Sequence, residues 1–561
     1  MGNDPVTAER FDTVVVGSGF GGSTVAYRLA AAGLSVCVLE RGRAYPPGSF
    51  PTSPIGIREN LWDPSEGYSG LFNVWSFRRL EALVASGLGG GSLIYANVLL
   101  RKDERWFVRE NGAGTHEFWP VTRQELDPHY DRVEAMLKPQ QYPFERAPYD
   151  TTPKTRAFQD AAEKLGLDYG LPPLAVTFAN PGEDPRLGIP VVEPLENLHG
   201  QPRRTCILCG ECDTGCNYGS KNTLDYTYLS AAQLKGAVIR IRSEARGFRP
   251  RPGGGYSIRY VEHRPDLEGI KTDTSALPMV EIEADYLVLS AGALGTTFLL
   301  LKNRAQLPHV SPALGSRFCG NGDLLGIFVR AKRRLDPNRG PVITSFVRVP
   351  DALDGDGARG RGYYIEDGGH PVFVNWILEG SQVHGNIRRF GRFAWRRLMS
   401  RLEGAPKSDI TAEVRSLLSG KLSATSLPVL GMGRDIPDGT MTLNKKGFLT
   451  IDWTTKSSEK YFAALQGTMT AMAKELGGRF KVNPTWFLRR VITVHPLGGC
   501  PMGRSESEGV VDSYGEVFNH PDLFIADGSV MPGPVGANPS LTIAALADRT
   551  ADRILEKKGL G

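Results

Sequence analysis

The sequence contains no apolar run of about 18 residues, the length at which a helix can span a membrane, so no transmembrane helix is expected. It also lacks a strong excess of charge of either sign, because 66 basic residues stand against 61 acidic ones. A net charge of +5 without a recognisable nucleic-acid-binding module argues against a nucleic-acid partner. The first residues, MGNDPVTAER, contain no charged and then apolar leader, so the predicted location is cytoplasmic.

Cysteine is scarce, with seven residues in the chain, yet four of the seven stand together in the stretch CILCGECDTGC. In the cytoplasm thiols stay reduced, and clustered cysteines there hold metal more often than they form disulfides. The spacing C-x2-C-x2-C-x3-C matches that of bacterial ferredoxins, except that Asn217 replaces the usual proline. The pattern predicts an iron–sulfur cluster, [3Fe-4S] or [4Fe-4S], and leaves open reduced structural thiols, zinc or disulfides. The candidate ligands are Cys206, Cys209, Cys212 and Cys216.

The first forty residues follow a strand–helix–strand pattern. The run FDTVVV at 11–16 predicts a buried parallel strand, and the Ala-rich residues 22–32 predict a helix. SVCVL at 35–39 predicts a second strand, which ends at Glu40. Between the first strand and the helix stands GSGFGG, at 17–22, a G-x-G-x-x-G sequence. A pattern with all of these parts predicts a dinucleotide-binding unit.

Each glycine of this sequence has a distinct expected role. Gly17 allows the tight turn, Gly19 lets the backbone approach a pyrophosphate, and Gly22 lets the helix pack on the strand. The positive end of the helix then faces the phosphates. Glu40 is placed to accept hydrogen bonds from the ribose hydroxyls and would repel a 2′-phosphate, which disfavours NADP. This unit alone leaves FAD and NAD open.

Four later stretches add to this pattern: GLGGGS, YLVLSAGALGT, HPLGGC, and a final strand, loop and helix that contain ADGS and NPSLT. With them the chain resembles the glucose–methanol–choline (GMC) oxidoreductases, in the branch that includes cholesterol oxidases. The resemblance runs from residue 11 to residue 555. It implies FAD as the cofactor and the oxidation of an alcohol by hydride transfer to the flavin.

The resemblance also implies roles for particular residues. His495 and Asn538 match two family residues that flank the flavin N5, so His495 is expected to accept or steer the hydroxyl proton and Asn538 to hold the oxygen. No histidine lies in or beside GLGGGS, which favours noncovalent FAD. The predicted FAD-binding residues are Gly17, Gly19, Phe20, Gly22, Glu40, Arg41, Gly89, Gly91, Ser92, Asn97, Ala291, Asp527, Gly528, Asn538, Pro539 and Ser540.

Two departures from the cholesterol oxidase pattern bear on the substrate side. Those enzymes carry an asparagine shortly after GGGS, whereas here either Asn97 is displaced or Tyr95 takes its place. They also carry a glutamate base before a tryptophan, where this chain has Asn375, with Glu366 and Glu379 as nearby alternatives. Sterol specificity therefore does not carry over from the resemblance.

The expected fold combines α/β and α+β parts: a Rossmann-like FAD-binding domain with an inserted substrate domain built on an antiparallel sheet. Because the FAD stretches fall at the start, middle and end of the chain, the FAD-binding domain is expected to be discontinuous, over 1–110, 205–320 and 488–561. The substrate-binding domain is expected over 111–204 and 321–487.

Residues 386–402, NIRRFGRFAWRRLMSRL, predict a basic amphipathic helix. Such a helix can cover a core, lie on an anionic membrane surface or dock an acidic electron carrier, and the sequence leaves these three open. Peripheral membrane association is therefore one of the expected possibilities.

The sequence as a whole predicts FAD-dependent oxidation of a hydrophobic alcohol, either a sterol or a long-chain or aromatic alcohol. Some GMC dehydrogenases hold an iron–sulfur cluster, and CNYGSKNTLDYTYL resembles the segment that follows their cysteines. This resemblance implies that electrons leave through the cluster to an acceptor protein or a quinone. The alternatives are an O2-using oxidase without a cluster, and a non-redox flavoprotein such as a lyase.

Overall fold

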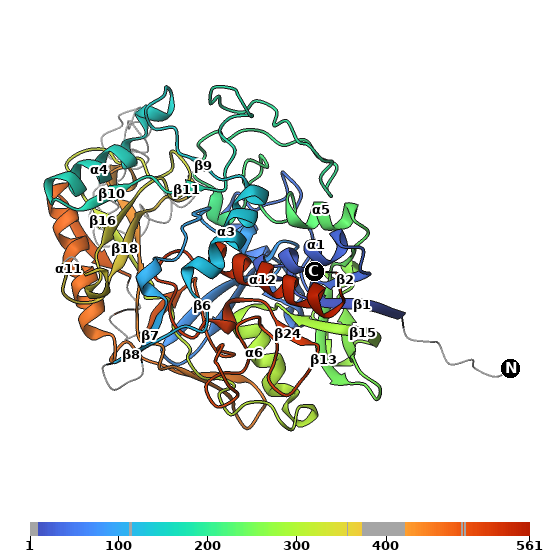
Figure 1. Ribbon diagram of the computed structural model, residues 1–561. Coiled ribbons are helices and arrows are strands. Elements are labelled where there is room, and N and C mark those ends of the chain that lie inside the picture. Colours follow the sequence, from blue (N-terminus) through green and yellow to red (C-terminus); the bar gives the residue numbers. More distant parts are fainter. Residues whose placement is uncertain are drawn as a thin grey trace, which may run out of the picture.

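The computed structural model describes residues 9–110, 115–355, 357–372, 421–483, 486 and 490–560. Two large sheets stand on opposite sides of the molecule, with the C-terminal helix between them (Figure 1). The combination of a Rossmann-like sheet and a separate antiparallel sheet confirms the predicted fold class. Of the helices in the described residues, none is long and apolar enough to cross a membrane.

The first sheet has seven strands and is parallel at its centre. Four parallel strands run in the order β12, β2, β1, β15, and the last half of β15 also pairs with the parallel strand β24. The first half of β15 pairs instead with an antiparallel hairpin of β14 and β13. The strands are β1 (Glu9–Val16), β2 (Val36–Leu39), β12 (Val238–Arg240), β13 (Ser243–Pro250), β14 (Tyr256–Glu262), β15 (Met279–Leu289) and β24 (Leu523–Ile525).

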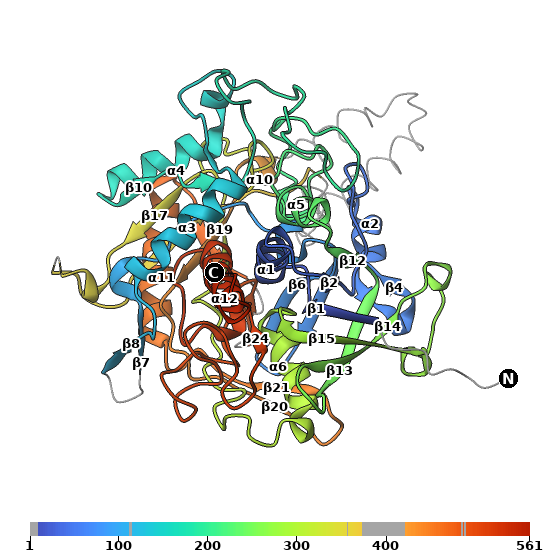
Figure 2. The same ribbon diagram turned by 45° about the vertical axis from the view of Figure 1, so that its right-hand side comes forward.

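Helices cover both faces of this sheet. Alternate strand residues such as Val15 and Val288 pack under α1 (Phe20–Ala31) and α12 (Ser540–Lys557), which lie side by side in Figure 2. The other strand residues, such as Leu289, share a core with α6 (Gly292–Lys302). The first helix begins two residues earlier than predicted, because Gly19 is extended (φ −69°, ψ −170°) and serves as its N-cap. Because the central strands are parallel, their carboxyl ends lie at one shared edge of the sheet.

The second sheet has six antiparallel strands, in the order β10, β17, β18, β19, β16, β22. One of its faces packs under α11 (Glu459–Glu475) and α4 (Pro153–Lys164). Along β18 the side chains alternate, so Ile365 points into that helical core whereas Tyr364 packs on the other face, against Ala537. The strands are β10 (Asp168–Gly170), β16 (Leu324–Val329), β17 (Phe346–Val349), β18 (Tyr363–Asp367), β19 (Leu427–Gly433) and β22 (Arg479–Val482).

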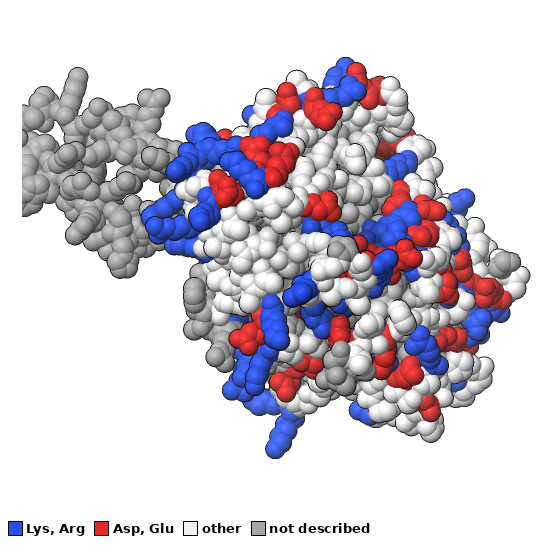
Figure 3. Space-filling view, turned by 60° about the vertical axis from the view of Figure 1, so that its left-hand side comes forward, with Lys and Arg blue, Asp and Glu red and all other residues white. Residues whose placement is uncertain are grey.

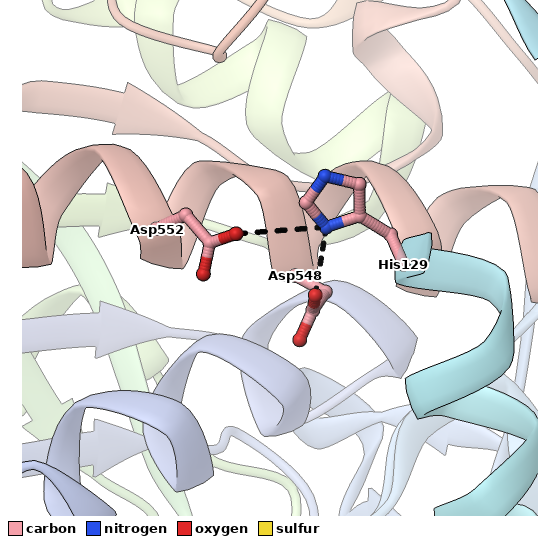
Figure 4. A group of neighbouring side chains, drawn as sticks. All are labelled: His129, Asp548 and Asp552. Carbon is pink, nitrogen blue, oxygen red and sulfur yellow. Dashed lines mark hydrogen bonds and ion pairs between the residues drawn. The ribbon is translucent and has the colours of Figure 1, made fainter. Parts of the chain in front are cut away.

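An ion-pair network ties α12 to α1 and to α3 (Arg123–Leu137) (Figure 4). His129 Nδ1 lies 2.8 Å from an oxygen of the buried Asp548 and 3.8 Å from Asp552. Arg28 and Arg132 each pair with both aspartates. Because two guanidinium groups already compensate the two carboxylates, the network joins three helices and is not suited to hold a metal ion.

Charge is mixed on the surface. Figure 3 shows Lys and Arg side chains interspersed with Asp and Glu on the face that it presents. Among the described residues on this face, no continuous basic surface of the kind that binds nucleic acid is present. The predicted helix at 386–402, together with Asn375 and Glu379, lies outside the described residues.

Candidate active site

The glycine-rich turn after β1 contacts the turns that follow β15 and β24. A Cβ atom on Gly17 (φ +102°) would lie 2.2 Å from the carbonyl oxygen of Ser290. A Cβ on Gly21 would lie 1.5 Å from the carbonyl oxygen of Ala526. Only glycine fits at either position, so the three turns meet with their backbones in direct contact.

The second glycine-rich loop lies on the first. Ser18 Oγ donates a hydrogen bond to Glu40 Oε2 (2.6 Å) and accepts one from the Gly89 N–H (3.0 Å). The other oxygen of Glu40 accepts from the Gly42 N–H at 2.8 Å. Glu40 is thus buried at the end of β2 with both oxygens anchored to this loop cluster.

These loops border an open space in front of α1. Cβ atoms built on Gly19, Gly91 and Gly292 would meet nothing within 4 Å. The N-terminus of α1 has no side-chain cap, so its first N–H groups face the same region. Asn97 is fully buried, and neither its amide nitrogen nor its amide oxygen has a partner among the described residues. Unfilled backbone cradles and an unsatisfied amide are what a buried FAD would complete, so the residues present fit that cofactor.

The predicted role of Asp527 at the FAD stays a prediction, because its carboxylate is occupied by its own loops. One oxygen accepts from the Ser529 N–H (2.8 Å) and Oγ (2.6 Å). The other accepts from the Gly292 N–H (2.9 Å) and from Thr296 Oγ1. Burial raises the pKa of Asp527. The side chain therefore joins the turns after β15 and β24.

The other predicted FAD-binding residues lie in the same group of loops. Phe20 packs edge-on against Tyr95, with ring centroids 5.3 Å apart, and Arg41 lies over the ring of Trp62 at 5.1 Å. Ser92 Oγ donates to the Gly89 carbonyl at 2.7 Å, which closes that loop. The remaining predicted residues belong to the first turn of α1, to the turns after β15 and β24 and to the start of α12: Gly22, Ala291, Gly528, Pro539 and Ser540.

His495 is held by Asp323, a buried residue that sequence analysis did not identify. His495 Nδ1 lies 2.8 Å from Asp323 Oδ1. The second carboxylate oxygen accepts from Thr493 Oγ1 (2.8 Å) and from the Val494 (2.8 Å) and His495 (3.1 Å) N–H groups. With a proton on Nδ1 donated to this carboxylate, Nε2 is left as a hydrogen-bond acceptor. The one sequence signal was the Gly-rich stretch CGNGD, which has no fixed spacing from the histidine.

Asn538 lies beside Glu366, one of the two glutamates that the sequence offered as alternatives. Asn538 Nδ2 donates to Glu366 Oε2 at 3.4 Å. Glu366 Oε1 and Asn538 Oδ1 are both buried and have no partner among the described residues. Burial, together with the nearby Asp367 and Asp323, raises the pKa of Glu366 to about 8, although the hydrogen bond from Asn538 lowers it. An unpartnered amide oxygen and a titratable carboxyl group therefore lie side by side in the protein interior.

The same loop that carries Asp323 also holds the segment before Asn538. Asn321 Oδ1 accepts from the Gly536 N–H (2.8 Å), and Asn321 Nδ2 donates to the Ala537 carbonyl (3.0 Å). Two residues further along, Asp323 holds His495. The two predicted catalytic residues are thus positioned by one short loop.

The raised pKa of Glu366 predicts a pH-dependent stability. Its folded-state pKa of about 8 exceeds the unfolded value of about 4.3, so the unfolded state releases the proton first. Stability is therefore lost as pH rises between these two values. We expect Glu366→Gln to unfold at a higher temperature than the wild type, by a margin that grows from pH 5 to pH 8. Thermal unfolding at pH 5, 7 and 9 measures this, with substitution of the exposed Glu262 at the end of β14 (Glu262→Gln) as control. A margin that does not change with pH would contradict it.

The four clustered cysteines line one cavity. Its empty volume is about 330 Å³, including the mouth. The N–H of Leu208 donates to Cys206 Sγ (3.4 Å), and that of Ser220 donates to Cys216 Sγ (3.2 Å). Leu208 adopts φ +64°, which is unusual for a non-glycine residue. All four thiols are free.

Comparisons with known proteins agree with this arrangement. Residues 437–547 match a family model described as GMC oxidoreductase, and residues 12–145 match one described as FAD dependent oxidoreductase. The chain is 30% identical to a cholesterol oxidase of Mycobacterium tuberculosis, over 96% of this chain and 90% of that one. It is 27% identical to a cholesterol oxidase of Acinetobacter baumannii, over 98% of this chain and 95% of that one.

Two further comparisons, one of sequence and one of structure, extend to more distant proteins. A long-chain-alcohol oxidase of Arabidopsis thaliana is 24% identical, over 99% of this chain and 68% of that one. The crystal structure of pyridoxine 4-oxidase from Mesorbium loti superposes with a TM-score of 0.57 at 17% identity, over 97% of this chain and 98% of that one, which shows a shared fold. The chain therefore belongs to the GMC oxidoreductase family, as an FAD-dependent enzyme that acts on CH–OH donors.

Proposed function

We propose that the enzyme oxidises a hydrophobic alcohol, either a sterol or a long-chain or aromatic alcohol. The observation that carries the proposal is the short loop at 321–323, which holds both His495 and the segment before Asn538, together with the unpartnered oxygens of Asn538 and Glu366. The hydrophobic character of the alcohol is supported by relatives whose names specify cholesterol and long-chain alcohols.

The reaction requires an alcohol to lose a proton from its hydroxyl oxygen and a hydride from the carbon that carries this oxygen. FAD, when bound, supplies the hydride acceptor, N5 of its ring system. We assign the proton to His495 Nε2, because Asp323 orients the imidazole through Nδ1 and stabilises the cation that forms. Asn538 Oδ1, which lacks a partner, positions the hydroxyl group. Glu366, with a pKa of about 8, holds a proton at neutral pH and becomes a second proton acceptor only once it is ionised at higher pH.

The cysteine cavity supports a second element of the proposal, an iron–sulfur cluster held by Cys206, Cys209, Cys212 and Cys216. A single zinc ion with sulfur ligands at about 2.3 Å would draw its four sulfurs to within roughly 4 Å of one another. In the described part of the chain, no three of these sulfur atoms lie within 4.8 Å of one another, so they are not gathered around a single zinc ion. Backbone N–H groups aimed at two of the sulfurs fit an iron–sulfur cluster. Such a cluster would carry electrons onward one at a time, to an acceptor protein or a quinone.

An O2-using oxidase without a cluster is the second candidate function. It is favoured by the names of the cholesterol and long-chain-alcohol relatives, which are oxidases. The two candidates differ in iron content and in the acceptor that reoxidises the enzyme. A non-redox reaction, such as that of a lyase, would need no net reduction of the flavin.

Anaerobic mixing with alcohols tests the proposed oxidation. We expect cholesterol, long-chain primary alcohols or benzylic alcohols to bleach the flavin absorbance in the absence of O2, with glucose and choline as polar controls. Bleaching by none of the alcohols would reject the proposal and favour a non-redox reaction. Readmission of O2 then separates the candidates: rapid recolouring with H2O2 formation indicates an oxidase, and slow recolouring that a one-electron acceptor accelerates indicates a dehydrogenase.

A further inference from the structure

Lys221 is a buried cation that lies between the cysteine cavity and the second glycine-rich loop. It lines the cavity of the four cysteines and is 1% exposed. Its ammonium donates three hydrogen bonds, to the carbonyl oxygens of Leu93 (3.1 Å), Tyr95 (2.9 Å) and Cys212 (2.9 Å). Two of these acceptors belong to the loop that borders the FAD space, and the third belongs to the cysteine loop. One side chain therefore joins the two sites.

The charge of Lys221 has no carboxylate in direct contact, although Asp213 and Asp225 attract it from further away. Among the described residues, no Asp or Glu oxygen forms an ion pair with it, and its three hydrogen bonds all go to neutral carbonyl groups. Lys154, which is equally buried, instead lies 3.2 Å from a carboxylate oxygen of Asp367. A buried charge that no carboxylate contacts directly is costly, so an anionic group in the cavity would stabilise Lys221. The cavity is lined by the four thiols and by one acidic side chain, Glu211.

The contact extends toward the start of α1. The Lys221 ammonium lies 4.9 Å from the centre of the Tyr95 ring, and that ring packs edge-on against Phe20 at 5.3 Å. Phe20 is the first residue of α1, directly after the glycine that faces the open space. A continuous chain of contacts thus runs from the cysteine loop through Lys221 and Tyr95 to Phe20 at the FAD-binding turn.

We propose that Lys221 is the counter-cation of an anionic iron–sulfide–thiolate group in the cysteine cavity, and that it couples this group to the FAD-binding loop. This inference rests on the cluster of the proposed function. A positive charge beside a redox centre favours the reduced form, because the added electron is attracted to it. Lys221 is a positioning residue here, since it acts on the centre from outside its ligand set.

Potentiometric titration of Lys221→Met tests the inference in anaerobically purified holoprotein. Iron and acid-labile sulfide per FAD are measured first, and the reduced fraction of the centre is then followed by EPR at fixed potentials. We expect Lys221→Met to lower the ratio of reduced to oxidised centre at least tenfold, a shift of 59 mV for a one-electron couple. Lys221→Arg, which keeps the charge, is expected to keep the wild-type ratio. Lys235→Met makes the same charge change at an exposed site and is expected to have no effect.

The outcomes separate this inference from the proposal beneath it. Wild-type protein without iron would remove both the cluster and the role of Lys221. Wild-type protein with iron, and an unchanged ratio in Lys221→Met, would overturn only the inference. Loss of iron in Lys221→Met but not in Lys221→Arg would support it, because only the methionine variant loses the positive charge. Loss of iron in both variants would overturn it in favour of a steric role.

Discussion

Replacing His495 with glutamine is expected to lower kcat by about 10²- to 10⁴-fold, the range that a positioned proton acceptor supplies. Glutamine retains a hydrogen-bonding side chain near the hydroxyl group but cannot take its proton at neutral pH. The rate of anaerobic flavin bleaching by the best alcohol measures the effect directly, because it excludes the reoxidation step. FAD content, read from absorbance, shows whether the variant still binds the cofactor.

Asp323→Asn is the companion to this variant. The variant keeps the size of the side chain. It replaces one carboxylate oxygen, which accepts hydrogen bonds from His495 or from the neighbouring N–H groups, with an amide nitrogen that cannot accept them. We expect slower bleaching with His495 still present, and a changed pH profile, because the imidazolium loses its carboxylate partner. Asp435→Asn is a matched control, since that buried carboxylate accepts from Gly320 in the same loop and does not contact the histidine.

A wild-type rate of flavin bleaching in His495→Gln would contradict the first prediction. It would assign proton acceptance to Glu366 instead of His495.

Replacing Gly19 with valine is expected to give a folded protein that has lost at least 90% of its FAD, on the order of a 1.4 kcal/mol or larger loss in binding. The backbone of Gly19 is in a conformation that other residues adopt, and its Cβ would enter open space within the protein chain. The valine side chain would then stand where a pyrophosphate must approach. FAD per chain, measured together with far-UV circular dichroism, tests both halves of this expectation.

Gly21→Ala provides the contrasting variant. Its new Cβ would lie 1.5 Å from the Ala526 carbonyl oxygen, so this substitution is expected to destabilise the fold itself. If Gly19→Val retained full FAD occupancy, the open space before α1 would not be the pyrophosphate site. Unfolding of both variants would remove the distinction between a steric block and a packing defect.

The neighbourhoods of the predicted residues show where sequence and structure each contributed. The βαβ unit could be predicted because its parts are local: an apolar strand, a turn that requires glycine, a helix and a second strand follow one another within forty residues. The roles of His495 and Asn538 could also be predicted, because each residue stands in a short contiguous sequence motif. The antiparallel sheet was predicted as a type, while its strand order depended on pairings between distant segments.

By itself the sequence determined the dinucleotide-binding unit, the candidate catalytic histidine and asparagine, and the spacing of the four cysteines. Only the tertiary structure placed Asp323 on His495, Glu366 on Asn538 and Lys221 between the cysteines and the FAD-binding loop. These partners come from separate strands and loops, so no spacing along the chain relates them. Their positions follow from burial: a charged or polar group that folding removes from water must meet its partner in three dimensions.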